Sequence, residues 1–465
     1  MVKAEMGTQV CQPVRVLHVL GRLNMGGAES RIMDLYRHID RSKVQFDFLV
    51  HTEARPADGE TTSEALMAAR RPDDFDAEIR SLGGRIYALP RFNGRNFAAY
   101  RRAAEAFFAA HHDWVLVEGH MTSMASVYLP IAKAAGVPHT AAHVRSAGVD
   151  PGIRGAVTRL FRHSLPRRAD ELYTCSRLAG EAVYGARVMA SGRVRLIPNA
   201  IDTEAYRYDA EVRRAERAAL GLPEDALVLG HVGRFDAMKN QTFLVDCLAG
   251  LPERFRLLFV GDGALRQKVA EQAAAAGLAG RVIFAGRRSP AGTRRLYQAM
   301  DLFVFPSLYE GLPGTVVEAQ AAGLDCLIAD TITEEVCLTD LVSRIPLRPA
   351  KAWRDWIVAK AGERSGQKTG ASGEEKTLPA ERNSGKKIAA PGGSEPSPVE
   401  EEVVQKTAVP RGSEPSPVAV RSSYSEGPDF DRAERSARAI QKLKEAGYDV
   451  SEEARQMQEW YLSKA

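Results

Sequence analysis

The chain lacks three features that would place it in other protein classes. Its five cysteines are scattered singly among 465 residues and never form a CxxC pair, which argues against a structural zinc site and favours a reducing compartment. No stretch approaches the ~20 apolar residues of a membrane-spanning helix, and the N-terminus has no apolar signal segment. The net charge is only +4, so nucleic acid is not an expected partner. We expect a cytoplasmic protein, with at most peripheral contact at the inner face of the plasma membrane.

Short apolar runs rich in β-branched residues alternate with helical patterns from Val14 onward. One series begins with VRVLHVL and VQFDFLV, and a second begins with LVLGHVGR and FRLLFVG. Strands of parallel sheets have this composition because helices bury both of their faces. The sequence therefore predicts an α/β protein with two Rossmann-like, doubly wound domains, at residues 14–195 and 196–362, and a cleft between them. Residues 1–13 are expected to be a flexible terminus.

The composition changes sharply after residue 362. Gly, Ser, Pro, Lys and Glu dominate residues 363–427, where KIAAPGGSEPSPV recurs imperfectly as KTAVPRGSEPSPV. So polar a segment buries too little apolar surface to offset its chain entropy, and we expect a disordered insert. Helical periodicity returns at residues 428–465, where a final helix capped by Ser451 is expected to dock back onto the folded body. The alternative is a loosely attached tail, which would leave Trp460 and Tyr461 exposed.

The first strand-to-helix turn contains Gly26 and Gly27 in the sequence GRLNMGGAES. Glycines at such a turn let backbone N–H groups approach an anion or a sugar at the helix N-terminus. The GxGxxG spacing of a dinucleotide site is not met. A tight turn without a ligand explains the two glycines equally well.

The second domain places cations just beyond its first strand, in the sequence GRFDAMKNQ. Ligands of open α/β sheets bind outside the carboxyl ends of strands. The Arg234 fork and the Lys239 point charge suit the two phosphates of a nucleoside diphosphate and can neutralise a departing diphosphate without a metal ion. The alternative is that both are solvated loop cations.

A later loop, PSLYEGLPGTVVEAQAAG, contains two glutamates that could hold sugar hydroxyls. Carboxylates accept hydrogen bonds from vicinal hydroxyls, so Glu318 could bind a ribose and Glu310 the transferred sugar. The residues between them would offer backbone N–H groups to the diphosphate: Gly311, Leu312, Gly314 and Thr315. A capping box formed by Thr315 and Glu318 would explain Glu318 without a ligand.

These segments together resemble the retaining GT-B glycosyltransferases of group 1 and family 4, particularly those of bacterial exopolysaccharide assembly. The shared elements are the EX7E motif from Glu310 to Glu318, GR…KN upstream, VGDG at residues 260–263 and the N-terminal GGAE. The resemblance covers approximately residues 14–350 and the last forty or so, and it does not cover the insert. All four elements in this order are far more specific than EX7E alone.

The resemblance implies a role for each residue. Arg234 and Lys239 bind the donor diphosphate, Glu318 the ribose and Glu310 the donor sugar, while Gly26 and Gly27 border the site from an N-terminal, acceptor-side domain. His120, in WVLVEGHMTSM, matches a position that faces the donor sugar and acceptor. A hydrogen-bonded histidine at a strand end is the rival interpretation.

The activity implied is metal-independent transfer of a hexose-type sugar, with retention of configuration, from a UDP- or GDP-linked donor to a saccharide or polyprenyl-linked acceptor. No further cofactor is expected. A nucleotide-sugar epimerase of the same fold and a non-catalytic sugar-nucleotide-binding scaffold remain alternatives. Arginines alternate with apolar residues in the segment Gly152–Arg168, as in a basic amphipathic helix that lies on an anionic membrane. A solvated helix that packs its apolar face inward explains the segment equally well.

Overall fold

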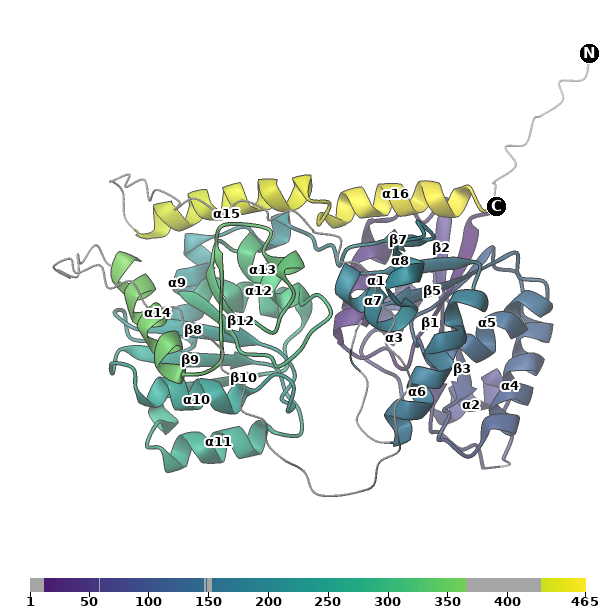
Figure 1. The fold of residues 1–465 in the computed structure, drawn as a ribbon, viewed down its shortest axis with the longest axis horizontal. Helices are drawn as coiled ribbons and strands as arrows, with labels where there is room; N and C mark the ends of the chain where they lie inside the picture. Colours follow the sequence, from purple (N-terminus) through teal and green to yellow (C-terminus); the bar gives the residue numbers. More distant parts are fainter. Residues whose placement is uncertain (1–11, 58, 146–147, 149–152, 365–427) are drawn as a thin grey trace, which may run out of the picture. The chain divides into compact units, whose positions relative to one another are not determined.

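A computed structural model describes residues 12–57, 59–145, 148, 153–364 and 428–465. Three predicted features lie wholly or mostly outside these ranges: the flexible terminus, the insert at residues 363–427, and Gly152 at the start of the basic segment. The described residues contain two parallel sheets with helices between most successive strands (Figure 1). In this part of the chain, no helix has both the length and the apolar character needed to cross a bilayer.

The first sheet has the strand order β3-β2-β1-β4-β5-β6-β7. Its strands are β1 (Val14–Val19), β2 (Val44–Thr52), β3 (Ile86–Pro90), β4 (Leu116–Gly119), β5 (His139–Val144), β6 (Glu171–Thr174) and β7 (Val194–Leu196). The associated helices are α1 (Gly27–His38), α2 (Ser63–Ala69), α3 (Asp76–Ser81), α4 (Phe97–Ala110), α5 (Ala125–Ala134), α6 (Ile153–Ser164), α7 (Arg177–Tyr184) and α8 (Ala186–Met189), with a 3-10 turn at Leu165–Arg167. We refer to this half as the N-terminal domain.

The second sheet repeats the same winding, in the order β10-β9-β8-β11-β12-β13. Its strands are β8 (Leu227–Val232), β9 (Phe255–Val260), β10 (Val282–Gly286), β11 (Leu302–Phe305), β12 (Asp325–Ala329) and β13 (Val342–Ile345). Its helices are α9 (Ala210–Ala219), α10 (Gln241–Ala249), α11 (Arg266–Ala275), α12 (Pro290–Ala299), α13 (Gly314–Ala321) and α14 (Ala350–Arg364), with 3-10 turns at Glu204–Tyr206, Ala279–Arg281 and Glu334–Val336. This half is the C-terminal domain.

The predicted fold class is confirmed. Every strand pairing within the two sheets is parallel, and the inner strands are buried along most of their length, as the continuous apolar runs require. In both sheets the order of strands reverses between the first and fourth strands, β1 and β4 in one and β8 and β11 in the other. Ligands of doubly wound sheets bind at the carboxyl ends of the strands at this switch point.

Two helices, α15 (Pro428–Glu445) and α16 (Val450–Leu462), follow the insert and are drawn in yellow in Figure 1. Helix α15 packs against α13, and α16 packs against α1. In α16, the Tyr461 ring is buried, and its hydroxyl donates to Oε2 of Glu118 at 3.2 Å. The capping prediction was wrong by two residues: Asp449 is the N-cap, and its side chain accepts from the Ser451 backbone N–H, since aspartate caps as well as serine does.

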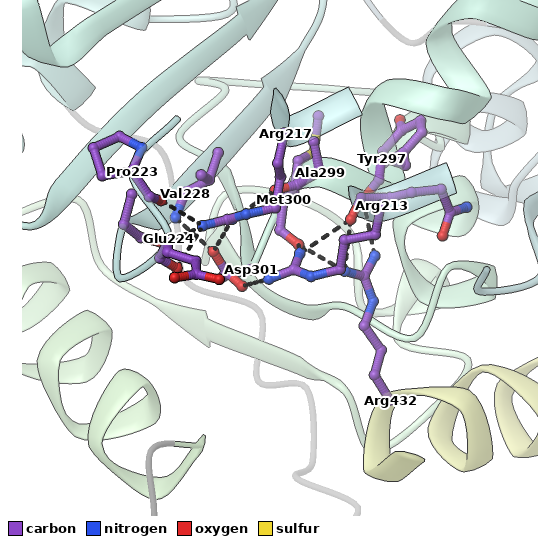
Figure 2. Close-up of polar contacts among 12 residues, drawn as sticks. Arg213, Arg217, Pro223, Glu224, Val228, Tyr297, Ala299, Met300, Asp301 and Arg432 are labelled. Atoms are coloured by element: carbon purple, nitrogen blue, oxygen red, sulfur yellow. Dashed lines mark hydrogen bonds and ion pairs between the residues drawn. The ribbon is translucent and has the colours of Figure 1, made fainter. Parts of the chain in front are cut away.

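Helix α15 is anchored by a buried arginine. The Arg432 guanidinium donates to backbone carbonyls at the end of α12 and the end of α13, with distances of 2.7 Å to Met300 and 3.0 Å to Ala322. Figure 2 shows Arg432 beside a second cluster, in which Asp301 pairs with Arg213 and Arg217 from α9. Buried donors and acceptors that satisfy one another in this way fix where α15 lies on the C-terminal domain.

Candidate active site

The segments singled out in the sequence follow the switch-point strands. Gly26 and Gly27 come after β1, and His120 comes directly after β4. In the second sheet, Arg234 and Lys239 follow β8, and Glu310 follows β11. Because all of these strands are parallel, each group of residues lies at the ligand-binding edge of its own sheet. What each segment can do depends on the environment of its side chains.

Lys239 and Glu310 lie together at this edge of the C-terminal sheet. The Lys239 Nζ is 2.6 Å from Oε1 of Glu310, and both side chains are largely buried. The ammonium group also lies 4.8 Å from the centre of the Phe305 ring, whose face attracts cations. When a donor binds, such a cation can bind a phosphate oxygen in place of the carboxylate. The carboxylate can then accept hydrogen bonds from sugar hydroxyls.

Arg234 has a different environment. Its side chain is 75% exposed, and its Nε donates to Oδ2 of Asp236 at 3.0 Å. The VGDG motif lies directly beside this loop: Gly261 and Gly263 have positive φ values of 137° and 156°, and a Cβ on Gly261 would collide with the Gly233 carbonyl. Glycine is required there because two loop backbones touch. The motif thus supports the Arg234 loop, while the arginine itself extends into solvent.

Glu318 is not a capping residue. Helix α13 begins at Gly314 with Pro313 as its N-cap and no side-chain cap. The alternative capping box of Thr315 and Glu318 is therefore not formed. The Glu318 carboxylate instead accepts from NH2 of Arg31 at 2.8 Å and from the Tyr297 hydroxyl at 2.9 Å. Burial raises its pKa above the usual value, although the Arg31 charge opposes this shift.

The backbone between the two glutamates is held from the N-terminal domain and the segment that follows it. The Asn199 amide donates to the Leu312 carbonyl at 3.1 Å, and Ser176 Oγ donates to the Gly311 carbonyl at 3.4 Å. Gly314 and Thr315 form the first turn of α13, where backbone N–H groups lack partners within the helix. This N-terminus is suited to an anion such as a diphosphate.

Gly26 and Gly27 occupy the start of α1. Gly26 is the N-cap and uses no side-chain cap, and a Cβ placed on it would collide with the Glu29 carboxylate. No atom lies within 4 Å of a Cβ placed on Gly27. A side chain at Gly26 would require the Glu29 carboxylate to move, and the open space at Gly27 leaves room beside the helix N-terminus.

The His120 imidazole points into the N-terminal domain, with a side-chain exposure of 2%. Its Nε2 lies 3.1 Å from Nδ1 of His18 and 3.6 Å from Oε1 of Glu118. A third histidine, His143, places its Nδ1 2.7 Å from the same carboxylate oxygen. Burial lowers the pKa of His120 well below its usual value, so this histidine is neutral at physiological pH.

Glu118 is the charged centre of this cluster. Burial alone would raise its pKa, but the hydrogen bond from His143 and the neighbouring histidines hold the pKa below the usual range. His18, Glu118 and His120 bring potential ligand atoms within 4.8 Å of one another, a spacing that a metal ion could use.

Comparison with known proteins places this geometry in a family. The model of Glycosyltransferase Family 4 matches residues 25–205, and the model of Glycosyl transferases group 1 matches residues 212–346. A protein of Bacillus subtilis (strain 168) named "Putative glycosyltransferase EpsF" is 36% identical over 355 residues, which are 75% of this chain and 88% of that protein. The chain belongs to the GT-B glycosyltransferases.

One solved structure with the same fold and one further relative also resemble the chain. The structure of HepE from Anabaena in complex with UDP-glucose has the same fold, with a TM-score of 0.59, 18% identity and coverage of 76% of this chain and 90% of that one. An Escherichia coli enzyme, UDP-Gal:alpha-D-GlcNAc-diphosphoundecaprenol alpha-1,3-galactosyltransferase, is 28% identical over 144 residues, 30% of this chain and 37% of that enzyme. Glycosyltransferase activity and the GT-B fold predicted from the sequence are thus confirmed.

Sequence reasoning missed several residues that touch the predicted site, including Arg31, Tyr297, Glu29 and Asn199. Arg31 and Tyr297 bind Glu318, Glu29 lies against the start of α1, and Asn199 holds the loop after Glu310. Arg31 and Glu29 belong to the GGAES segment and its helix, so their position after the glycines was a usable signal. Asn199 and Tyr297 lie 113 and 21 residues from their partners, and nothing in their local sequence indicates the contact.

Proposed function

We propose that the chain transfers a sugar from a UDP- or GDP-linked donor to a saccharide or polyprenyl-linked acceptor during cell-surface glycan or exopolysaccharide synthesis. The observation that carries this proposal is the Lys239–Glu310 pair beside the N-terminus of α13. When the donor binds, Lys239 turns to the diphosphate together with Arg234, and Glu310 accepts hydrogen bonds from the donor sugar. Glu318 holds the ribose.

The reaction follows from these roles. The acceptor hydroxyl oxygen forms a bond to the anomeric carbon as the bond from that carbon to the diphosphate oxygen breaks, and the leaving diphosphate takes up the hydroxyl proton. Cations and helix N–H groups stabilise the negative charge that develops on the diphosphate, which is the reason for proposing metal-independent transfer. Retention of configuration is proposed from the resemblance to retaining enzymes of this fold.

The acceptor class rests on two observations. The Escherichia coli relative acts, by its name, on a diphosphoundecaprenol-linked sugar. In this chain, α4, α5 and α6 border a cavity of about 530 Å³, whose walls include Phe97, Ile131 and Phe161. Its charged residues are Arg168 and the pair of Arg101 with Glu105, 2.7 Å apart. Apolar walls with arginines beside them suit a lipid chain and its phosphates.

Contact with an anionic membrane at the inner face of the plasma membrane is part of this proposal. Leu160 on α6 is 73% exposed, and Arg159 beside it is exposed as well. An Arg159→Glu/Leu160→Ser variant is expected to co-sediment less with phosphatidylglycerol vesicles than the wild type does, because it loses both the charge and the apolar insertion. Arg214→Glu, an exposed arginine on α9, is the matched control. Equal sedimentation of all three proteins would contradict membrane contact through α6.

The activity is tested by incubating the purified chain with UDP- and GDP-sugars in the presence of EDTA and a panel of saccharide and polyprenyl-diphosphate acceptors. Release of nucleoside diphosphate with formation of a glycoside is the expected result. Formation of an epimeric sugar nucleotide without an acceptor would instead identify an epimerase. Donor binding without any turnover would identify a non-catalytic scaffold.

A further inference from the structure

Arg145 connects the buried histidine cluster to the loop that follows Glu310. It comes directly after β5, and its guanidinium donates from Nε to Nδ1 of His120 at 3.4 Å and from NH1 to Oδ1 of Asn199 at 3.0 Å. Asn199 donates in turn from Nδ2 to the Leu312 carbonyl at 3.1 Å. Asn199 is buried, with 8% of the residue exposed. One continuous series of hydrogen bonds thus links β4 to the backbone before α13.

Arg145 also decides where the His120 proton resides. A guanidinium has only donors, so Nδ1 of His120 must accept, and the ring proton of the neutral imidazole must then be on Nε2. That proton faces Nδ1 of His18, which lies 3.1 Å away and accepts it. An imidazole protonated on Nε2 cannot use Nε2 as a metal ligand. The donor set of His18, Glu118 and His120 therefore fits a hydrogen-bonded network better than a metal centre, despite its spacing.

The Asn199 side chain carries both an acceptor oxygen and a donor nitrogen, which no other side chain of its size does. The oxygen accepts from Arg145 and the nitrogen donates to Leu312, so the two contacts fix the amide orientation. The Leu312 peptide is immediately before Pro313, the N-cap of α13. Holding its carbonyl sets the direction of the backbone that enters the helix and hence of the N–H groups of Gly314 and Thr315.

We infer that Arg145 and Asn199 are positioning residues that hold the diphosphate-binding backbone before α13 against the His120 cluster. The inference rests on the proposed function, since it assumes that a donor diphosphate binds at this helix N-terminus. Preorganised donors act on a leaving group only when they are held within a fraction of an ångström, so loosening Asn199 weakens donor binding before it affects the fold.

The experiment compares Asn199→Asp, Asn199→Ala, Arg145→Lys and Arg145→Ala with the wild type, using the sugar nucleotide that the wild type turns over. Asn199→Asp keeps the shape and the acceptor for Arg145 but loses the donor to Leu312. We expect it to raise the donor KM about fivefold to tenfold, which corresponds to the free energy of one hydrogen bond. The change in kcat should be smaller, and the acceptor KM should be unchanged. Asn93→Ala, in a loop where its side chain bonds only near neighbours, is the matched control.

A double-mutant cycle separates positioning from general loss of structure. If Arg145 and Asn199 act as one unit, the donor KM of the double Ala variant is close to that of the worse single variant rather than the product of both effects. Arg145→Lys should restore part of the loss seen in Arg145→Ala. If an Ala variant does not fold, the two conservative variants decide the result.

The inference fails if Asn199→Asp has a wild-type donor KM, or if the effects of the two Ala substitutions multiply independently. An added Zn²⁺ titration that raises the melting temperature of the wild type but not of a His18→Ala variant would overturn the proton assignment. These results are distinct from failure of the proposed function, in which the wild type itself turns over no sugar nucleotide.

Discussion

The ammonium of Lys239 and the carboxylate of Glu310 are 2.6 Å apart, although 71 residues separate them in the sequence. The ion pair therefore holds both side chains in place at the carboxyl edge of the second sheet. The strands β8 and β11 are hydrogen-bonded neighbours, which explains why the loops that follow them meet. A site built from such a pair has its cation and its hydroxyl acceptor ready before any donor arrives.

Substitution of either partner is expected to abolish most of the transfer. Glu310→Gln removes the acceptor charge for the donor sugar, and Lys239→Ala removes a cation from the diphosphate, so each should lower kcat/KM at least about 100-fold. The rates are measured as nucleoside diphosphate release. Glu53→Gln is the control, because Glu53 forms an exposed pair with Arg91 at 2.7 Å. Turnover near the wild-type rate in both site variants would remove the assignment.

The Arg31–Glu318 pair predicts a coupled loss of stability. Arg31→Met leaves the Glu318 carboxylate buried without its cationic partner, which is expected to lower the free energy of unfolding by about 3 kcal/mol. The Arg31→Met/Glu318→Met double variant should lose less than the sum of the single variants. Urea unfolding of the three proteins measures this coupling, and strictly additive losses would show that the pair does not act as one.

We expect the contacts of Arg432 to hold α15 on the C-terminal domain and to contribute to stability. Its guanidinium binds carbonyls of Tyr297, Gln298, Met300 and Ala322 and is almost fully buried. Arg432→Met should therefore reduce stability on the order of 3 kcal/mol, since several charge-assisted hydrogen bonds are lost together. Arg438→Met, on the exposed face of the same helix, should change it little. Equal melting temperatures of the two variants would contradict this anchoring role.

His51 predicts a pH dependence of stability. Its Nδ1 donates to the Leu20 carbonyl at 3.0 Å, its Nε2 lies 2.9 Å from the Tyr100 hydroxyl, and burial lowers its pKa to about 4. The unfolded chain binds the proton near pH 6.5, so stability from this group is complete above that pH and is lost as pH falls towards 4. Over this window, the unfolding free energy of the wild type should fall more steeply than that of His51→Gln, by about 1.4 kcal/mol per pH unit. Parallel curves would contradict the assignment.

The sequence predicted the parts of the molecule that depend on local pattern. Apolar runs alternating with helices identified two parallel sheets, and the loops after β1, β4, β8 and β11 followed because strand ends locate ligand sites. The roles of individual side chains were harder to predict. A capping box at Thr315 was a sound local interpretation of Glu318, yet the contact with Arg31 spans 287 residues and has no local signal.

The burial and orientation of individual side chains also could not be predicted from the sequence. His120 was chosen for its place after a strand, but whether its ring points to solvent or into the domain depends on His18, Glu118 and Arg145, which come from two strands and a loop. Similarly, Ser451 and Asp449 are both good N-caps, and Asp449 is the one that forms an isolated parallel bridge with Ile201, 248 residues away in the sequence. Such choices are made by long-range contacts that a single sequence does not display.

The central claim is that the C-terminal domain grips the donor diphosphate while two glutamates hold the attached sugars. The most direct measurement is a crystal structure of the chain with bound UDP- or GDP-sugar. We predict Lys239 and Arg234 within hydrogen-bond distance of the phosphates, Glu318 on the ribose and Glu310 on the transferred sugar, with the Lys239–Glu310 contact opened. A donor bound elsewhere while Lys239 and Glu310 stay paired would contradict the account.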